Sequence, residues 1–417
     1  MTHSTPEDLE MPCLLRCPSR AGRKPTSIPD TTQFAGVTQS LFGVPCATPE
    51  EAYRLGMYNE LYLLHLVVPE HLRGTVPSKV LARVSRDDKT RSDISIESEV
   101  ATMVFVRSRT NIPVPLVYGY CPTRDNAIGQ PFSILSFTEG ADMGSSLWEN
   151  LSIDLKLKSI KDYARIILEL SRLKFDRIGS IYFKRNTPPP HCFELGPVSW
   201  CKHESAARRK NCQNNRGPFR TSTSWLKAAL DDEIDFMDKL PELARTTYKF
   251  RPEEGSGARM RRWRLAKRVV PEFRDRIADV IEDPLDRYSA GPFVLAHLDL
   301  RPCNMIFATE GINAGHIVSV IDWEMATTVP LWTLVCYPSW FGSAGLHAAK
   351  RDPEETQLFK DTYVRELQKY TRDFSILNVV QNARAEAKRL FADAAMLPWP
   401  AVDSMALWLD RNPKKAN

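Results

Sequence analysis

Residues 293–325 read FVLAHLDLRPCNMIFATEGINAGHIVSVIDWEM. The apolar run that opens this stretch is typical of a buried strand. It leads directly into three side chains of a single short loop, His297, Asp299 and Asn304. A histidine, a carboxylate and an amide set so closely behind a buried strand indicate a loop that does chemistry, because binding and catalytic residues concentrate on loops that a rigid scaffold positions.

Two short apolar strands are predicted after this loop, at 305–307 and 317–321, with a turn around Gly311. The second strand is followed at once by Asp322. Since an antiparallel hairpin returns the chain to the place where it began, Asn304 and Asp322 are expected at the same edge. The sequence therefore predicts one polar constellation, made of His297, Asp299, Asn304 and Asp322.

These residue types suit phosphoryl transfer from ATP. That reaction needs a carboxylate beside the attacking hydroxyl, and it needs oxygen ligands that hold Mg²⁺ against the phosphates. Asp299 suits the first role, as the catalytic residue that orients the hydroxyl and takes part in its deprotonation. Asn304 offers a neutral oxygen and Asp322 an anionic one, so these two are the predicted metal ligands.

The pattern H-x-D-x-x-x-x-N, followed by I-D-W-E at 321–324, resembles the aminoglycoside phosphotransferase and choline kinase-like family, which is related to the protein kinases. Protein kinases carry H-R-D-x-x-x-x-N and D-F-G instead. The resemblance implies that Arg301 is a second catalytic residue that stabilises charge on the transferring group, with a salt bridge inside the loop as the alternative. His297 is expected to be structural. Leu298 departs from the family, which often has glycine there.

The resemblance covers roughly residues 45–400 and implies an α+β, bilobal, protein-kinase-like fold with the nucleotide between the lobes. A small N-terminal lobe with a mixed β-sheet is expected at 41–140, and a larger, mainly helical lobe for catalysis and substrate at 141–417. Residues 1–40 hold five of the 30 prolines and show no apolar periodicity. They are predicted to form a disordered or loosely attached tail.

The resemblance also implies nucleotide contacts in the N-terminal lobe. Arg83 lies where the family has a phosphate-binding lysine, and Glu99 on the next helix would pair with it. The alternative for the two residues is a surface charge and an acid favoured by a helix N-terminus. Gly56 lies in a strand–turn–strand that would cover the phosphates, although an ordinary hairpin turn explains it as well. Backbone groups of a short connection would pair with adenine, at Ser136, Phe137 and Thr138.

Composition narrows the functional class. The net charge of +5 is too small to indicate nucleic-acid binding, and no apolar run is long enough to span a bilayer. The first ten residues are acidic and lack an apolar core, which argues against a secretory signal. The nine cysteines are odd in number and scattered, so we expect reduced thiols in a cytoplasmic protein.

The cysteine and histidine residues between 192 and 212, and the basic segment 255–268, each allow a structural and a functional interpretation. Cys192, Cys201, His203 and Cys212 could suggest zinc, but their spacing lacks a C-x-x-C pair, so unpaired thiols are the favoured interpretation. The basic segment 255–268 is expected to be a solvated helix face, with an acidic partner or surface as the alternative. Such a segment fits poorly with a polycationic acceptor.

Helical periodicity is clearest towards the C-terminus. The alanine-rich stretch 383–396 is predicted to be the last strong helix. Pro398 and Pro400 are expected to break it, with one more helical turn around 403–409.

Three functions stay open from the sequence. The first is an ATP- and Mg²⁺-dependent transfer to a hydroxyl of a small molecule. The second is a catalytically weak nucleotide-binding relative, suggested by Arg83 and by the poor glycine loop. The third is a protein kinase, which the I-D-W-E sequence and the lack of an A-P-E segment disfavour.

Overall fold

The protein is described from a computed structural model of the chain. The structure describes residues 15–16, 29–56, 58–86, 93–142, 145–184, 192–200, 206–212, 215–247, 256–283, 286, 288–342 and 352–413. Its contacts divide the chain into two compact units. Unit 1 comprises 1–109, 113–139 and 181–194, and unit 2 comprises 110–112, 140–180 and 195–417.

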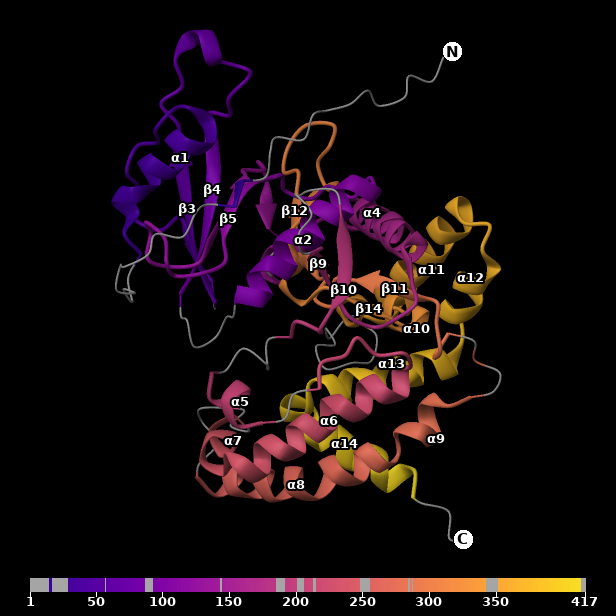
Figure 1. Cartoon of the computed structure of the whole chain (residues 1–417). Helices are drawn as coiled ribbons and strands as arrows, with labels where there is room; N and C mark the ends of the chain where they lie inside the picture. The colour runs from indigo at the N-terminus through magenta and orange to yellow at the C-terminus, as the bar shows by residue number, and fades with distance from the viewer. Residues whose placement is uncertain are drawn as a thin grey trace. The chain divides into compact units, whose positions relative to one another are not determined.

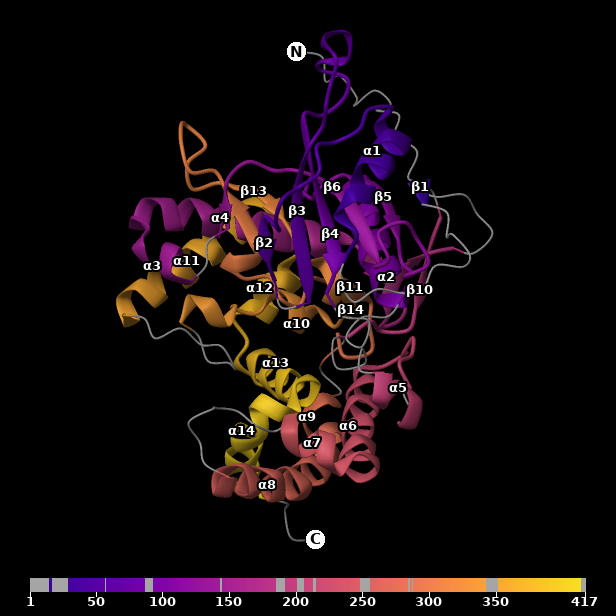
Figure 2. The same cartoon turned by 90° about the vertical axis from the view of Figure 1, so that its left-hand side faces the viewer.

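Unit 1 is built on a six-stranded sheet with the strand order β1-β5-β6-β4-β3-β2, which Figure 2 shows nearly face on. Its strands are β1 (Leu15–Arg16), β2 (Arg54–Leu55), β3 (Asn59–His65), β4 (Lys79–Ser85), β5 (Val117–Cys121) and β6 (Phe132–Ser136). β1 pairs with β5 in parallel, while the other neighbours are antiparallel. The sheet is therefore mixed, as predicted.

The sequence of β4 shows how the sheet forms. Val80, Ala82 and Val84 are fully buried, whereas Leu81 and Arg83 between them are only partly buried. Side chains alternate between the two faces of a strand, so one face of β4 joins the core of unit 1 and the other presents Arg83. Helix α2 (Asp93–Arg109) supplies the partner of Arg83.

Helix α1 (Phe34–Phe42) begins inside the segment that was predicted to be a tail. The tail prediction for 1–40 is wrong for residues 29–40, because Phe34 is fully buried and its ring lies 5.4 Å from that of Tyr62 on β3. Phe34 and Val37 belong to the core cluster of the sheet. Figure 1 shows α1 beside β3 and β4. Cys13 and Cys17 lie outside the described residues.

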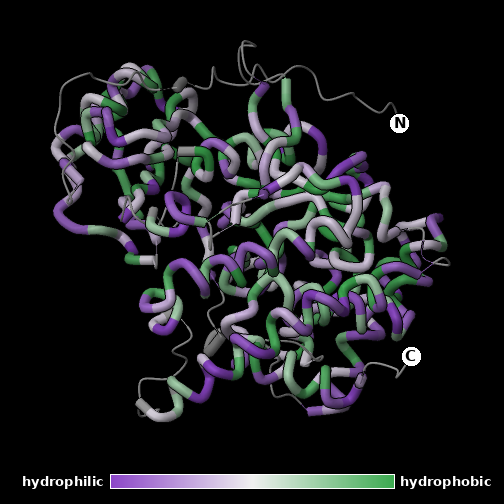
Figure 3. Tube along the Cα trace, turned by 60° about the horizontal axis from the view of Figure 1, so that its bottom comes forward, coloured by the Kyte–Doolittle hydropathy of each residue, from purple (hydrophilic) through white to green (hydrophobic). Residues whose placement is uncertain are grey.

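Unit 2 is mainly helical, and green and purple alternate along its helices in the hydropathy view of Figure 3, as expected for elements with one buried face. Its main helices are α3 (Ser145–Asn150), α4 (Ile153–Arg172), α5 (Ala206–Asn211), α6 (Ser222–Lys239), α7 (Pro241–Thr247), α8 (Ser256–Asp275), α9 (Ile277–Ile281), α10 (Leu331–Val335), α11 (Pro353–Tyr370), α12 (Phe374–Val380), α13 (Ala383–Met396) and α14 (Pro398–Arg411).

Two three-stranded sheets in unit 2 position the loop after residue 296. One has the order β14-β11-β8 and the other β13-β12-β7. Their strands are β7 (Ala141–Asp142), β8 (Lys174–Phe175), β11 (Phe293–Ala296), β12 (Met305–Phe307), β13 (Ile317–Val320) and β14 (Thr327–Val329). A separate pair consists of β9 (Ser180–Phe183) and β10 (Phe193–Gly196), most of whose residues belong to unit 1. Gly140 leads into β7 with φ +143°, and a Cβ there would lie 2.5 Å from the Phe307 carbonyl oxygen, so only glycine fits.

The elements confirm the α+β fold class, with a small mixed-sheet unit and a larger, mainly helical one. The helix at 383–396 has the predicted bounds. The prediction for Pro398 and Pro400 was wrong in part, because α14 begins at Pro398 and continues to Arg411. Proline ends one helix and suits the first turn of the next, where its missing N–H has no helical partner to lose. Within the described residues, none of the helices combines the length and apolar character that crossing a membrane requires.

Candidate active site

The loop after β11 carries Asp299, and its backbone is unusual. Leu298 has φ +62° and Asp322 has φ +68°, and they are the only non-glycine residues with positive φ in the part of the chain that the structure describes. Such conformations cost about 1–3 kcal/mol each and cluster at functional sites. Leu298 thus adopts the left-handed conformation that glycine would take at lower cost, so the departure from the family leaves the loop's backbone course possible.

His297 ties this loop to the end of the neighbouring hairpin. Its side chain is buried, its Nε2 lies 2.8 Å from the Ile321 carbonyl oxygen, and its Nδ1 accepts from the Asp299 N–H at 3.3 Å. A carbonyl can only accept, so Nε2 carries the proton, and an N–H can only donate, so Nδ1 does not. His297 is therefore a neutral hydrogen-bonding brace in this structure, as the structural interpretation expects.

Asp299 is held through both of its carboxylate oxygens. Oδ1 forms an ion pair with Arg301 Nε at 2.8 Å, and Oδ2 accepts from Asn304 Nδ2 at 2.8 Å. The Asp299 side chain is 29% exposed, so it remains open to solvent. An ionised carboxylate has about four lone-pair sites, which leaves acceptor capacity for a substrate hydroxyl. The salt bridge within the loop, which was the alternative for Arg301, is formed, and the catalytic role of Arg301 stays a prediction.

Asn304 is oriented by Asp299 in turn. Its Nδ2 donates to both the backbone oxygen (2.9 Å) and the carboxylate of Asp299, so the group that remains for a cation is Oδ1. The Ile321 N–H donates to the Asn304 carbonyl oxygen at 3.0 Å, and Asp322 is the residue that follows Ile321 along the chain. An amide oxygen and a carboxylate are hard ligands that suit Mg²⁺, which usually keeps several waters and phosphate oxygens as its remaining ligands. In the described part of the chain, no cluster of three histidine, cysteine or acidic residues forms a metal site by itself.

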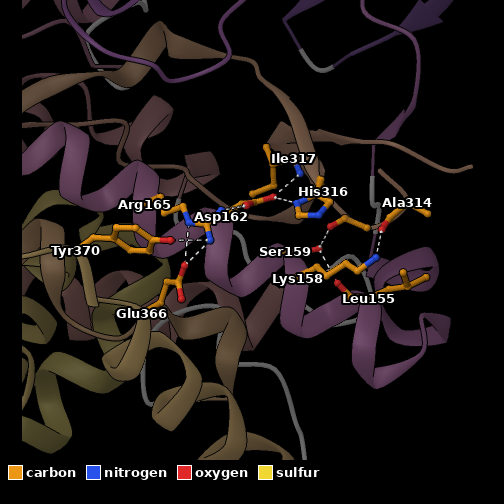
Figure 4. A network of polar contacts seen from close by, with 11 residues as sticks. Leu155, Lys158, Ser159, Asp162, Arg165, Ala314, His316, Ile317, Glu366 and Tyr370 are labelled. Carbon is orange, nitrogen blue, oxygen red and sulfur yellow. Dashed lines mark hydrogen bonds and ion pairs between the residues drawn. The ribbon is translucent and has the colours of Figure 1, made fainter. Parts of the chain in front are cut away.

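The β12–β13 hairpin that carries Asn304 and Asp322 is anchored on α4, as Figure 4 shows. Asp162 accepts from the Ile317 N–H at 3.1 Å and lies 2.8 Å from His316 Nδ1. Arg165 joins Asp162 to Glu366 of α11, with Nη1–Oδ1 at 3.3 Å and Nε–Oε1 at 2.8 Å. Further along α4, Lys158 and Ser159 donate to the carbonyls of Ala314 and Gly315. These contacts hold residues 314–317, at the end of the hairpin away from Asn304 and Asp322, against α4.

A cavity of about 470 Å³ opens beside the Asp299 loop within unit 2. Its wall includes residues 297–303 of the loop, parts of α3 and α4, and residues of α6, α10 and α13. Burial raises the pKa of the Cys303 thiol in this wall, although Arg301 counters part of the effect. The size is that of a small-molecule site.

In unit 1, Arg83 of β4 and Glu99 of α2 form an ion pair, and their side chains are only 11% and 5% exposed. The surface alternative for these two residues is therefore wrong, since both charges are buried and face each other. A buried cation on the strand with an acid on the following helix is the arrangement that holds phosphates in kinases.

The other residues that the resemblance implies for nucleotide binding differ in the contacts that they already make. Gly56 follows β2, and its N–H and carbonyl are bonded to Asn59 and Arg86 at 2.8 Å each. The Ser136 N–H donates to the Leu116 carbonyl, and its hydroxyl accepts from the Leu116 N–H at 2.9 Å. These Ser136 groups are thus already engaged. Phe137 packs edge-on against Tyr53 at 6.1 Å, with the Lys79 ammonium 5.0 Å from its ring, and Thr138 follows it, half-buried.

Of the four residues considered for zinc, Cys201 and His203 lie outside the described residues, and Cys192 and Cys212 are free thiols. The basic segment forms part of α8. Within it Trp263 is buried, while Arg262 and Lys267 form ion pairs with Asp403 of α14 and Asp238 of α6. Two of its cations are therefore neutralised within unit 2, which favours the interpretation as a solvated helix face over an acidic partner.

The sequence did not reveal the wall of the cavity. Trp148, Trp200 and Trp225 come from α3, from the segment after β10 and from α6, and Arg389 and Asp393 come from α13. No motif links residues so far apart along the chain. The only available signal was the content of nine tryptophans, since so many indoles in one chain often line a ligand site or a core.

Curated proteins from fungi are similar to parts of this chain. A subtelomeric hrmA-associated cluster protein of Aspergillus fumigatus is 26% identical over 330 residues, which cover 68% of this chain and 58% of that protein. This chain thus spans less than two thirds of that relative's length. Altered inheritance of mitochondria protein 9 of Meyerozyma guilliermondii is 30% identical over 138 residues, 33% of this chain and 22% of that protein.

Solved structures of aminoglycoside phosphotransferases are also similar. One, bound to ADP, has 13% identity and a TM-score of 0.44, covering 93% of both chains. Another, in a ternary complex with AMP-PNP and hygromycin B, has 11% identity and a TM-score of 0.45, covering 92% of this chain and 100% of the other. The similarity to these two carries no conclusion about the acceptor. The family model, in contrast, matches residues 70–333, more than half of the sequence, and the chain therefore belongs to the phosphotransferase enzyme family.

Proposed function

We propose that the protein is an ATP- and Mg²⁺-dependent phosphotransferase that moves the γ-phosphate of ATP to a hydroxyl of a small molecule. The observation that carries the proposal is the Asp299 carboxylate, held by Arg301 and Asn304 in the wall of a cavity of about 470 Å³. Family membership supports the reaction class, and the cavity supports an acceptor of small-molecule size.

In the proposed reaction, Asp299 accepts a hydrogen bond from the acceptor hydroxyl and aligns its oxygen with the γ-phosphorus of ATP. The new O–P bond forms as the bond between the γ-phosphorus and the β–γ bridging oxygen breaks, which leaves ADP. The hydroxyl proton passes to Asp299 and then to solvent. Because the transition state is loose, positioning by Asp299 contributes more than its basicity.

Other residues would bind the phosphates and the metal. Arg83, held by Glu99, would hold the α- and β-phosphates, in the role the family gives to lysine. Its planar fork suits phosphate oxygens. Asn304 Oδ1 and the Asp322 carboxylate would hold Mg²⁺, which when bound neutralises charge on the phosphates. The backbone of Phe137 and Thr138 would pair with adenine.

A nucleotide-binding protein without turnover is the second candidate. Arg83 in place of lysine and Gly56 as the sole glycine of its turn favour it. A protein kinase is disfavoured, because the chain has I-D-W-E in place of D-F-G and lacks an A-P-E segment after it.

Mass spectrometry of a metabolite extract incubated with the full chain, ATP and Mg²⁺ tests the proposal. We expect one or more compounds to gain the mass of a phosphoryl group, and we expect the gain to vanish in Asp299→Asn. Stabilisation by ATP without any mass gain would support the second candidate instead. Labelling of added proteins in place of metabolites would support a protein kinase. A matched control is Glu310→Gln, an exposed acid in the hairpin turn.

A further inference from the structure

Three successive carbonyl groups of the Asp299 loop each accept a hydrogen bond. The Asp299 carbonyl oxygen accepts from Asn304 Nδ2 at 2.9 Å, and the Arg301 carbonyl oxygen accepts from the Asn304 N–H at 2.9 Å. The carbonyl between them, that of Leu300, accepts from Trp340 Nε1 at 3.2 Å. Two of the three bonds are therefore local, and the third reaches the loop from a residue 40 positions further along the chain.

The bond from Trp340 lies beside strained backbone. Leu298 has φ +62°, and a non-glycine residue keeps such a conformation only where its surroundings over-determine the backbone. Within the described residues, Trp340 is the only residue outside 297–304 that forms a hydrogen bond with the backbone of 298–301. The indole N–H is therefore the one backbone restraint of this kind that comes from outside the loop.

Trp340 is itself fixed by its neighbours. It is 7% exposed and lies in a short 3-10 helix, Ser339–Phe341. Its ring lies edge-on to the rings of Trp148 on α3 and Tyr163 on α4, with centroid distances of 5.1 and 5.2 Å. Edge contacts between aromatic rings contribute about 0.5–1.5 kcal/mol each beyond the burial of their area. The indole is thus an ordered donor, and its bond to Leu300 requires little further ordering of the side chain.

Trp340 also belongs to the wall of the cavity beside Asp299. Its two ring partners, Trp148 and Tyr163, line the same cavity. Because protein interiors are closely packed, a shift of the Trp340 indole would change the cavity wall and the loop together. One side chain therefore links the space proposed for the acceptor to the backbone that carries the carboxylate.

We propose that Trp340 is a positioning residue for Asp299. Its indole N–H fixes the Leu300 carbonyl and so keeps the Asp299 carboxylate aligned with a hydroxyl of an acceptor in the cavity. The role rests on the proposed phosphotransfer function for the reaction that it serves, whereas the restraint on the backbone does not depend on that function. Misplacement of a reacting group by about 1 Å can cost about 100-fold in rate, so a single restraint is sufficient to matter.

Trp340→Phe tests this role, because it keeps an aromatic ring and removes the N–H. Trp332→Phe is the matched control. Trp332 is buried in α10, its Nε1 donates to Ser289 Oγ at 3.3 Å, and it lies outside the cavity wall. Both variants thus lose the same side-chain volume and one indole hydrogen bond. Hydrogen–deuterium exchange of the full chain, read by mass spectrometry on peptides that span 297–304, measures the loop without nucleotide or acceptor.

We expect amide exchange in this loop to be about 3- to 10-fold faster in Trp340→Phe, the effect of one neutral hydrogen bond, and unchanged in Trp332→Phe. Turnover is measured with ATP, Mg²⁺ and a compound that gains a phosphoryl group in the metabolite experiment. Its kcat should fall by a similar factor in Trp340→Phe, while the KM for ATP stays near that of the wild type. A purely structural role would lower the urea midpoints of both variants and leave exchange in the loop unchanged.

Unchanged exchange in the loop of Trp340→Phe would overturn the proposal, as would equal acceleration in Trp332→Phe. Faster exchange, with no phosphorylation of any compound by the wild type, would uphold the restraint and reject the phosphotransfer function. Phosphorylation with a wild-type kcat in Trp340→Phe would keep the function and reject the positioning role. If Trp340→Phe does not fold, Trp340→Met replaces it, since methionine is adaptable and lacks the donor. Failure of both variants to fold would confine Trp340 to the fold and reject its positioning role.

Discussion

In the Asp299 loop, both side-chain partners of the carboxylate lie within five residues of it, whereas Arg83 and Glu99 are sixteen residues apart and lie on two different elements, β4 and α2. The first group is partly exposed and the second is buried. A local, solvated network is formed at little cost to the fold, while a buried, long-range ion pair depends on its desolvation being matched by its partner. Substitutions in the Asp299 loop should therefore act mainly on activity, and substitutions in the Arg83–Glu99 pair mainly on stability.

Replacement of Asp299 should have the largest effect, and it should fall on activity. Asp299→Asn keeps the shape of the side chain but removes the charge and the proton acceptor. We expect turnover to drop by about 10²- to 10⁴-fold, the range for a positioned acid–base group. The urea midpoint should stay near that of the wild type, because the side chain is partly exposed. A large loss of stability with residual activity intact would contradict this contrast.

Breaking the buried pair should act mainly on stability. Arg83→Met or Glu99→Met leaves one buried charge without its main partner, and we expect each to lower the free energy of unfolding by about 3–5 kcal/mol. The double variant should lose less than either single variant, because no charge then remains uncompensated. Urea unfolding measures all three, and stabilisation by ATP should disappear wherever Arg83 is absent.

Lys79→Met is the matched control for this pair. Lys79 lies on the same strand, and its ion pair with Glu139 is largely exposed, so its loss should cost much less stability than the loss of either buried charge. If the double variant proved as unstable as the sum of the two single variants, the pair would not behave as a coupled buried unit.

Asp286 and Lys388 form another long-range pair, within unit 2, and sharpen the comparison through pH. Burial would raise the pKa of Asp286, but hydrogen bonds from Lys388, Ser289 and the Tyr288 N–H outweigh it, so the pKa is lowered. A carboxyl with a lowered pKa stabilises the fold above its ordinary pKa, and this contribution is lost as the pH falls through the lowered value. The charged carboxylate should therefore matter at neutral pH and cease to matter in acid.

Asp286→Asn should accordingly cost about 1.5–3 kcal/mol at neutral pH, the value of hydrogen bonds to a charged group. The difference from the wild type should shrink as the pH is lowered towards about 3, below the ordinary pKa of aspartate. Urea unfolding across this range measures it. A difference that stayed constant with pH would show that the charge of Asp286 contributes nothing.

The same division between local and long-range contacts explains what the sequence could predict. The strands around the Asp299 loop were predicted at 305–307 and 317–321, and they form at 305–307 and 317–320. Their signal is local, because apolar runs and turn residues lie next to one another along the chain. The roles of Asp299, Asn304 and Asp322 remain predictions that the geometry supports but that only experiment can test.

The sequence-based predictions were wrong or incomplete in two situations. In one, a segment was judged by its composition and not by its apolar periodicity. In the other, the fold brings together segments that are far apart along the chain. The tail boundary at residue 40 followed the prolines, although Pro29 is the last of them and Phe34, Val37 and Leu41 already show helical spacing. The cavity wall could not be predicted, because its tryptophans lie on elements that only tertiary packing brings together. The contribution of Ile321 was also hidden, since it acts through its backbone.

Asp162 should show the smallest effect, because it acts on the site from a distance. Asp162→Ala removes the acceptor of the Ile317 N–H and the partner of His316 and Arg165 (Figure 4). We expect a loss of about 1–2 kcal/mol in the free energy of unfolding, since one N–H loses its acceptor. Turnover should fall less than about 10-fold, because a loosened hairpin shifts Asn304 and Asp322 only slightly.

A metal titration separates a positioning role for Asp162 from a general loss of stability. If Asp162 acts through the hairpin, Asp162→Ala should raise the Mg²⁺ concentration needed for half-maximal turnover, since both proposed ligands lie at the hairpin's base. Asp361→Ala removes an exposed acid of α11 and should leave the Mg²⁺ requirement unchanged. A variant that lost stability while keeping the wild-type Mg²⁺ requirement would confine Asp162 to holding the fold, and the hairpin's alignment would then depend on its own ladder.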